Sequence, residues 1–170
     1  MSQLENMSQL ESIKQQMNYA LNFAMKVLDK AIMRIPDDKL DFKPIDTLNS
    51  IGDIATHIYM CALVYTAGTL KGDFTDNDYS IIPFDSKNIK SASEIIEYGK
   101  KVKAYIQEAL EKFTEADMQK EVTYTCWGGV KIPGFASMAT ILEEVIHHRG
   151  QLCVYLRLLG IEPPFIYDFS

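Results

Sequence analysis

The sequence contains little cysteine, and what there is does not form a recognisable motif. Three of the 170 residues are cysteine, an odd number, and no Cys-x-x-Cys pair occurs. The sequence therefore argues against a disulfide framework and against a cysteine-rich zinc site. Cys61 and Cys153 fall in apolar helical segments, where we expect small core residues. Cys126 lies outside the helices with no base beside it in sequence, so it does not indicate a nucleophile.

Clustered positive charge and long apolar runs are also missing, and no signal peptide is visible. The chain has 17 basic against 23 acidic residues and a net charge of -6, which argues against binding to nucleic-acid phosphates. No apolar run approaches the length needed to span a bilayer. The first residues lack the basic region and apolar stretch of a signal peptide. We therefore expect a soluble cytoplasmic protein that binds neither nucleic acid nor membrane.

What the sequence does contain is the composition of one globular domain with four long helices. Hydrophobic residues make up 47% and charged residues 24% of the chain, which suits a single domain over residues 1–170 with a substantial core. Apolar residues recur at helical spacing in four segments, at about residues 8–34, 50–70, 91–113 and 137–159. Gly160, followed by Pro163 and Pro164, marks the end of the last one.

Two connections between these helices are long. Residues 121–134 alternate apolar and polar side chains and contain a Gly-Gly turn, which predicts a short hairpin or an extended loop. Residues 71–90 are polar and too many for a simple connector, so this segment either packs across the bundle or is mobile. The predicted fold is all-α, a four-helix bundle with at least one long crossover.

The segment EEVIHHRGQL, residues 143–152, places two adjacent histidines in the last predicted helix. Residues four apart share a helix face, so His148 faces the same way as Glu144. His147 is rotated by roughly 100° from its neighbour. At most one of the two histidines can therefore join Glu144 in a shared site.

The third histidine, His57, lies in the apolar run of residues 51–65. A buried imidazole needs a hydrogen-bond partner or a metal. His57, Glu144 and His148 would form a two-histidine, one-carboxylate set with open positions, compatible with Zn, Ni, Fe or Mn. A core histidine satisfied by hydrogen bonds is the alternative that the residues alone leave open.

Four further polar or aromatic residues can be explained without making them metal ligands. Asp53 forms with Ser50 a plausible start signal for the second helix, and it could instead orient the imidazole of His57 or approach the metal. Arg149 suits a structural ion pair or a cap. Gln151 could hydrogen-bond a metal-binding histidine from behind. Trp127, at the Gly-Gly turn, either covers the mouth of the site or packs the hairpin onto the bundle.

The string HHRGQL, with LRLLGIEPP after it, within residues 147–164 resembles the last-helix signature of the DinB-like superfamily, which includes YfiT-like hydrolases and thiol-dependent transferases. IGDIATH, which ends at His57, fits the same pattern, and the resemblance covers nearly the whole chain. It implies an up-down-down-up bundle and a divalent metal held by three histidines, one from the second helix and two from the fourth. His57 matches the first ligand and His148 the third, whereas the middle position is Glu144, a departure from the pattern.

The resemblance also implies a function. We expect a metal-dependent small-molecule enzyme, of the thiol S-transferase or hydrolase type, that uses a low-molecular-weight thiol or another small substrate and forms a homodimer. The alternative is a non-catalytic, dimeric, stress-related helical bundle with a vestigial or structural metal site. The sequence identifies no catalytic residue beyond the three candidate ligands.

Overall fold

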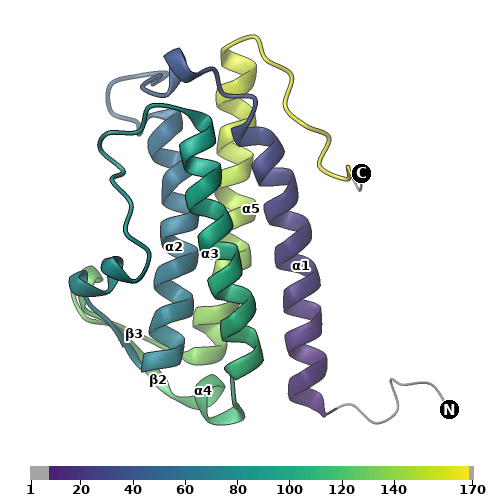
Figure 1. The fold of residues 1–170 in the computed structure, drawn as a ribbon, viewed down its shortest axis with the longest axis vertical. Helices are drawn as coiled ribbons and strands as arrows, with labels where there is room; N and C mark the ends of the chain where they lie inside the picture. Colours follow the sequence, from purple (N-terminus) through teal and green to yellow (C-terminus); the bar gives the residue numbers. More distant parts are fainter. Residues whose placement is uncertain (1–7, 169–170) are drawn as a thin grey trace, which may run out of the picture.

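The computed structural model describes residues 8–168 and confirms the predicted all-α four-helix bundle (Figure 1). The bundle consists of α1 (Gln9–Ile32), α2 (Ile51–Lys71), α3 (Ala92–Lys112) and α5 (Gly134–Leu158). A loop with a short 3-10 helix, η2 (Asp37–Lys39), joins α1 to α2 at one end. The helix α4 (Glu115–Gln119), which the sequence analysis did not anticipate, lies at the other end.

The helices run up, down, down and up, as Figure 1 shows. This order requires the chain to return along the whole length of the bundle between α2 and α3. The return segment contains β1 (Asp73–Phe74) and the 3-10 helix η3 (Asp76–Ile81). Further along it, the ring of Phe84 stacks on Tyr98 of α3 at 4.4 Å between centroids. Of the two expectations for residues 71–90, packing across the bundle is therefore the one observed.

The predicted hairpin is present and belongs to a small sheet. Its strands are β2 (Glu121–Tyr124) and β3 (Val130–Pro133), antiparallel and joined through the 3-10 turn η4 (Thr125–Trp127). β1 pairs in parallel with β2, which gives the order β1-β2-β3. A two-residue strand carries too little pattern to be read from sequence. Its pairing ties the start of the return segment to the hairpin.

The helix boundaries follow local capping chemistry. At the start of α2, the Ser50 side chain accepts from the Asp53 amide, and the Asp53 carboxylate accepts from the Ser50 amide. Asp53 is therefore a capping residue, as expected.

The prediction for the last helix was wrong at its start, because α5 begins at Gly134 rather than Ser137. Pro133 ends β3 with a φ of -62°, a value that leads directly into a helix. At its other end, α5 stops just before Gly160, which has a φ of 76°, as predicted.

The core is centred on α2, which buries side chains on most of its surface and packs between α3 and α5. α1 and α3 instead bury one stripe and expose the other. No helix within residues 8–168 combines the length and apolarity needed to cross a membrane. Because α2 and α5 pack closely, polar side chains on their facing surfaces are brought together within the bundle.

Candidate metal centre

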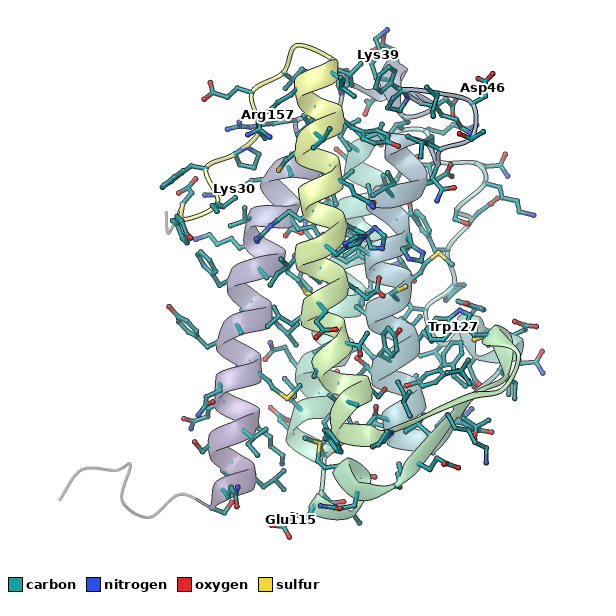
Figure 2. The ribbon with its side chains drawn as sticks, turned by 180° about the vertical axis from the view of Figure 1, so that it is seen from behind. Lys30, Lys39, Asp46, Glu115, Trp127 and Arg157 are labelled. Carbon is teal, nitrogen blue, oxygen red and sulfur yellow. The ribbon has the colours of Figure 1, made fainter. Side chains whose placement is uncertain are left out.

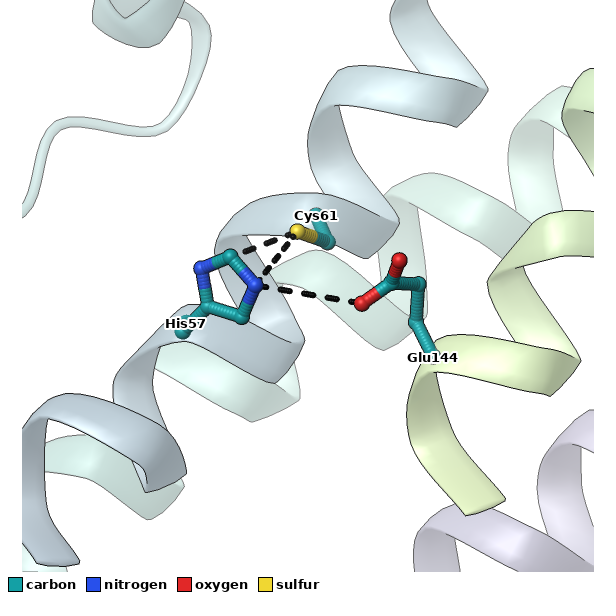
Figure 3. Close-up of side chains that lie close together, drawn as sticks. All are labelled: His57, Cys61 and Glu144. Atoms are coloured by element: carbon teal, nitrogen blue, oxygen red, sulfur yellow. Dashed lines mark hydrogen bonds and ion pairs between the residues drawn. The ribbon is translucent and has the colours of Figure 1, made fainter. Parts of the chain in front are cut away.

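Two helices supply the polar side chains of the candidate site. His57 and Cys61 lie one turn apart on α2, and Glu144 and His148 lie one turn apart on α5. Figure 3 shows His57 and Cys61 facing Glu144 across the helix interface. One donor atom from each of these three residues falls within 4.8 Å of the other two. The spacing of four residues on each helix is what aims both pairs at the same point.

Glu144 lies between the two histidines that the sequence analysis selected. Its Oε2 is 3.0 Å from Nε2 of His148 and 3.8 Å from Nε2 of His57. The two imidazole rings meet edge to face, with centroids 4.8 Å apart. The structure therefore brings His57, Glu144 and His148 together. The side chain of His57 is 51% exposed, against 25% for Glu144 and 18% for His148, so the group opens to solvent on the α2 side.

The hydrogen bonds of His148 leave one of its nitrogens facing an acceptor. Nδ1 of His148 is 2.8 Å from Oε1 of Gln151, and the Gln151 amide nitrogen is 3.1 Å from Nε2 of His147. With the amide in this orientation, Nδ1–H donates to Gln151, and a neutral ring presents a lone pair at Nε2. That lone pair faces the Glu144 carboxylate, which also only accepts. A cation, either a proton or a metal ion, is needed between them.

Gln151 thus fulfils the expectation of a hydrogen-bond partner behind a histidine. A ligand histidine that donates its other N–H to an oxygen is the usual arrangement at metal centres. His147 points elsewhere and meets the same amide from the other side, so only one of the adjacent histidines contacts Glu144. This outcome agrees with the rotation between successive helical residues.

The electrostatics favour a neutral imidazole at His57. Partial burial lowers the pKa of His57 from its ordinary value of 6.5, and the nearby His148 lowers it further, while the charge of Glu144 acts in the opposite direction. Neutral imidazole is the form that offers a lone pair to a cation.

Cys61 is the residue that sequence reasoning missed. We expected a small core residue, and Cys61 is indeed buried at 5% exposure. Its Sγ, however, lies 3.2 Å from Nε2 of His57. Burial, followed by the charge of Glu144, raises the pKa of the Cys61 thiol well above its ordinary value, so a free thiolate is disfavoured. Cys61 lies four residues after His57, the same spacing as between Glu144 and His148. This spacing could have identified Cys61 from the sequence.

The remaining candidates have structural roles. Arg149 donates to the carbonyl of Ala24 within α1 at 3.4 Å, so it makes a helix-to-helix contact rather than the expected ion pair or cap. Trp127 is stacked on Tyr124 at 5.1 Å and tilted against Tyr65 at 5.2 Å. It packs the hairpin onto the side of the bundle (Figure 2), which was one of its two expected roles.

A polar hollow of about 350 Å³ adjoins the exposed side of His57. It is lined by Asn49, Asp53, Thr56, His57, Met60 and Ser86. The lining combines the first turns of α2 with the return segment, so the long connection forms one wall. A small molecule in this hollow would reach the imidazole of His57 without crossing the core.

The structure combines a four-helix bundle and a hairpin with a donor cluster shared by α2 and α5. The profile of the DinB family matches residues 2–170, and the chain belongs to that family. It is similar to YjoA of Bacillus subtilis (strain 168), with 26% identity over 140 residues, which cover 82% of this chain and 86% of YjoA.

Solved structures show the same fold. A DinB-like protein from Bacillus cereus ATCC 10987 is 27% identical, with a TM-score of 0.64 over 90% of this chain and 94% of its own. The crystal structure of YjoA gives a TM-score of 0.69 at 24% identity, covering 89% and 97% of the two chains. YfiT from Bacillus subtilis, described as a probable metal-dependent hydrolase with an unusual four-helix bundle topology, gives 0.69 at 12% identity over 93% of each chain.

Proposed function

We propose that this DinB-family protein binds a divalent metal ion through His57, Glu144 and His148 and acts as a small-molecule enzyme of the thiol-transferase or hydrolase type. The observation that carries the proposal is the position of Glu144 Oε2 between the Nε2 atoms of the two histidines, at 3.0 and 3.8 Å. The likeness to YfiT, at 12% identity, supports the fold alone. The argument for a metal therefore rests on the donor atoms of this chain.

The donor types of these residues, and the hydrogen bond behind His148, suit a divalent ion. Two imidazoles and one carboxylate are common ligands of Zn, Ni, Fe and Mn. Gln151 fixes the ring of His148 from behind, and the negative charge of Glu144 offsets one charge of the ion. Relative to three neutral histidines, this carboxylate lowers the net charge of the site by one, which weakens the acidifying effect on anything bound there.

An ion held with open positions lowers the pKa of a bound water or thiol and so supplies a nucleophile at neutral pH. The half-exposed side chain of His57 and the adjoining hollow provide the access that such chemistry needs. Asn49, Asp53 and Ser86 offer polar groups that could orient a small substrate there. This access distinguishes the proposal from a closed structural metal site.

The first experiment measures metal in protein purified without a histidine tag, and again after incubation with Zn²⁺, Ni²⁺ or Mn²⁺. We expect near-stoichiometric metal in the wild type and its loss in His148→Ala and Glu144→Ala. His147→Ala and Glu143→Ala remove the same side chains one residue away, on the solvent side, and should retain the metal. Metal-free wild type under every condition would overturn the proposal.

The second experiment addresses the reaction. Wild-type protein loaded with metal is screened for transfer of low-molecular-weight thiols to electrophiles and for hydrolysis of amides and esters. Activity that is lost in Glu144→Ala and retained in Glu143→Ala supports the enzyme. Stoichiometric metal without turnover in either screen would leave a non-catalytic metal-binding bundle.

A further inference from the structure

We infer that Cys61 supplies a fourth protein ligand, a sulfur, to the metal centre, and that the centre is therefore selective for a thiophilic divalent ion such as Zn²⁺. The inference rests on the proposed function, because it concerns the same site. It goes beyond it by adding a ligand outside the two-histidine, one-carboxylate set and by narrowing the choice of metal.

The position of the sulfur carries the inference. Sγ of Cys61 is 3.2 Å from Nε2 of His57, and both atoms lie within 4.8 Å of a Glu144 carboxylate oxygen. In a tetrahedral zinc site, bond lengths of about 2.3 Å to sulfur and 2.0–2.1 Å to nitrogen place ligand atoms roughly 3.4–3.6 Å apart. The sulfur–nitrogen spacing is close to this range. His148 is not among the three mutually close donors and contacts Glu144 at 3.0 Å, so its ring would turn towards the sulfur to complete the coordination.

Burial alone would make Cys61 an ordinary core thiol, and Cys153 provides the comparison. Both cysteines are buried in long helices, at 5% and 8% exposure. Cys61 differs because its sulfur is directed at the imidazole of His57, which in turn faces Glu144 across the helix interface (Figure 3). The sulfur of Cys61 thus already forms a hydrogen bond with a candidate ligand, and a metal ion would take the place of the proton that they share.

The chemistry of sulfur then decides the metal. Thiolate ligands favour Zn²⁺ and disfavour Mn²⁺, which prefers carboxylates and water. On binding, the S–H bond breaks, its proton passes to solvent, and sulfur bonds to the ion. Four protein donors fill a tetrahedral zinc site. A substrate would therefore bind either as a fifth ligand from the exposed side of His57 or in place of one of the four donors.

The test uses Co²⁺, which has visible and near-ultraviolet absorption that Zn²⁺ lacks. Metal-free full-length wild type, Cys61→Ser and the double variant Cys126→Ser/Cys153→Ser are titrated with Co²⁺ and, separately, with Mn²⁺. We expect a sulfur-to-cobalt charge-transfer band in the wild type and the double variant, and none in Cys61→Ser. Co²⁺ affinity should fall more than about tenfold in Cys61→Ser, whereas Mn²⁺ affinity stays near that of the wild type.

The outcomes distinguish failure of this inference from failure of the proposed function. Cobalt bound by the wild type without a charge-transfer band would overturn the role of Cys61 and leave the three-residue site intact. A band lost in the double variant would assign the sulfur to another cysteine and also overturn it. No cobalt binding to the wild type would overturn both. The double variant keeps the test decisive even if Cys61→Ser does not fold, because only Cys61 remains in it.

Discussion

Two polar clusters lie between α2 and α5, and they differ in whether their hydrogen bonds are complete. The first joins Thr69 of α2, Ser137 of α5 and Tyr124 of β2, all at 0% exposure. Thr69 Oγ1 is 2.8 Å from the carbonyl of Tyr65 and 2.9 Å from Ser137 Oγ, which also bonds the Tyr124 hydroxyl. Three hydroxyls and one carbonyl satisfy one another, as buried polar groups must.

The second cluster is the candidate metal centre, formed by His57, Cys61, Glu144 and His148. Its carboxylate faces Nε2 of both histidines, and a proton or a metal ion is needed between these atoms. The side chains of His57, Glu144 and His148 are partly open to solvent. The same helix pair therefore holds one cluster that is complete by itself and one that needs a cation. The proposed metal binding rests on this difference: the first cluster stabilises the fold, and the second has a position that a proton or a metal ion would fill.

The largest expected effect tests the open cluster through a residue that is not a proposed ligand. Gln151→Ala removes the acceptor behind His148 and should weaken metal affinity about 10–100-fold, with little change in unfolding free energy. Metal titration by calorimetry, with urea unfolding alongside, measures both. His147→Ala removes the other partner of the same amide and should bind metal like the wild type. Equal affinity in Gln151→Ala would mean that the amide does not support a ligand.

The closed cluster should respond through packing. A Cβ on Gly68 would lie 2.7 Å from Cε1 of Tyr124, a fully buried ring. Gly68→Ala should therefore destabilise the fold by about 1–2 kcal/mol, since overpacking outweighs the gain in helix propensity. Gly150→Ala, on α5 where a Cβ meets nothing within 4 Å, should instead stabilise by up to about 1 kcal/mol. Denaturant unfolding of the pair checks the sign, and two changes of the same sign would contradict the contrast.

A smaller loss is expected from Ser137→Ala, which removes one hydroxyl from the closed cluster. The unfolding free energy should fall by about 0.5–1.5 kcal/mol, because the Tyr124 hydroxyl keeps Thr69 as a remaining neighbour. Metal affinity should not change. A variant that kept full stability and lost metal would show that the two clusters are coupled rather than independent.

The smallest effect is a pH dependence of the metal-free protein. Because the folded state lowers the pKa of His57 below 6.5, the unfolded chain binds this proton more readily. The unfolding free energy should therefore decrease as the pH falls from above 6.5 towards the lowered pKa. His57→Gln should show a flatter profile over the same range in urea unfolding with a chelator present. An unchanged profile would show that His57 does not contribute.

Much of the fold was predictable because its signals are local. Ser50 with Asp53 marked the start of α2, and Gly160 marked the end of α5, since capping depends only on neighbouring residues. The start of α5 could not be predicted in this way, because Pro133 both ends a strand and precedes a helix. β1 depends on a partner about fifty residues away, at Thr123 and Tyr124, which no local pattern reveals.

The candidate site was predictable in part for the same reason. Glu144 and His148 share a face by spacing alone, and His57 was selected because a histidine in an apolar helix needs a partner. Cys61 has the same spacing from His57, but cysteine is also an ordinary core residue, and its neighbourhood is apolar. Only the packing of α2 against α5 shows which way its sulfur faces.

The division of the donors between α2 and α5 also has a consequence for the order of events during synthesis. During synthesis, α2 leaves the ribosome before α5, and on its own it carries only His57 and Cys61. Glu144 and His148 arrive with the last helix, after the return segment, α3 and the hairpin. A nascent or truncated chain therefore lacks half of the donor set. If the proposed metal binds, loading would require α2 and α5 to have paired, so bound metal would report that step of folding.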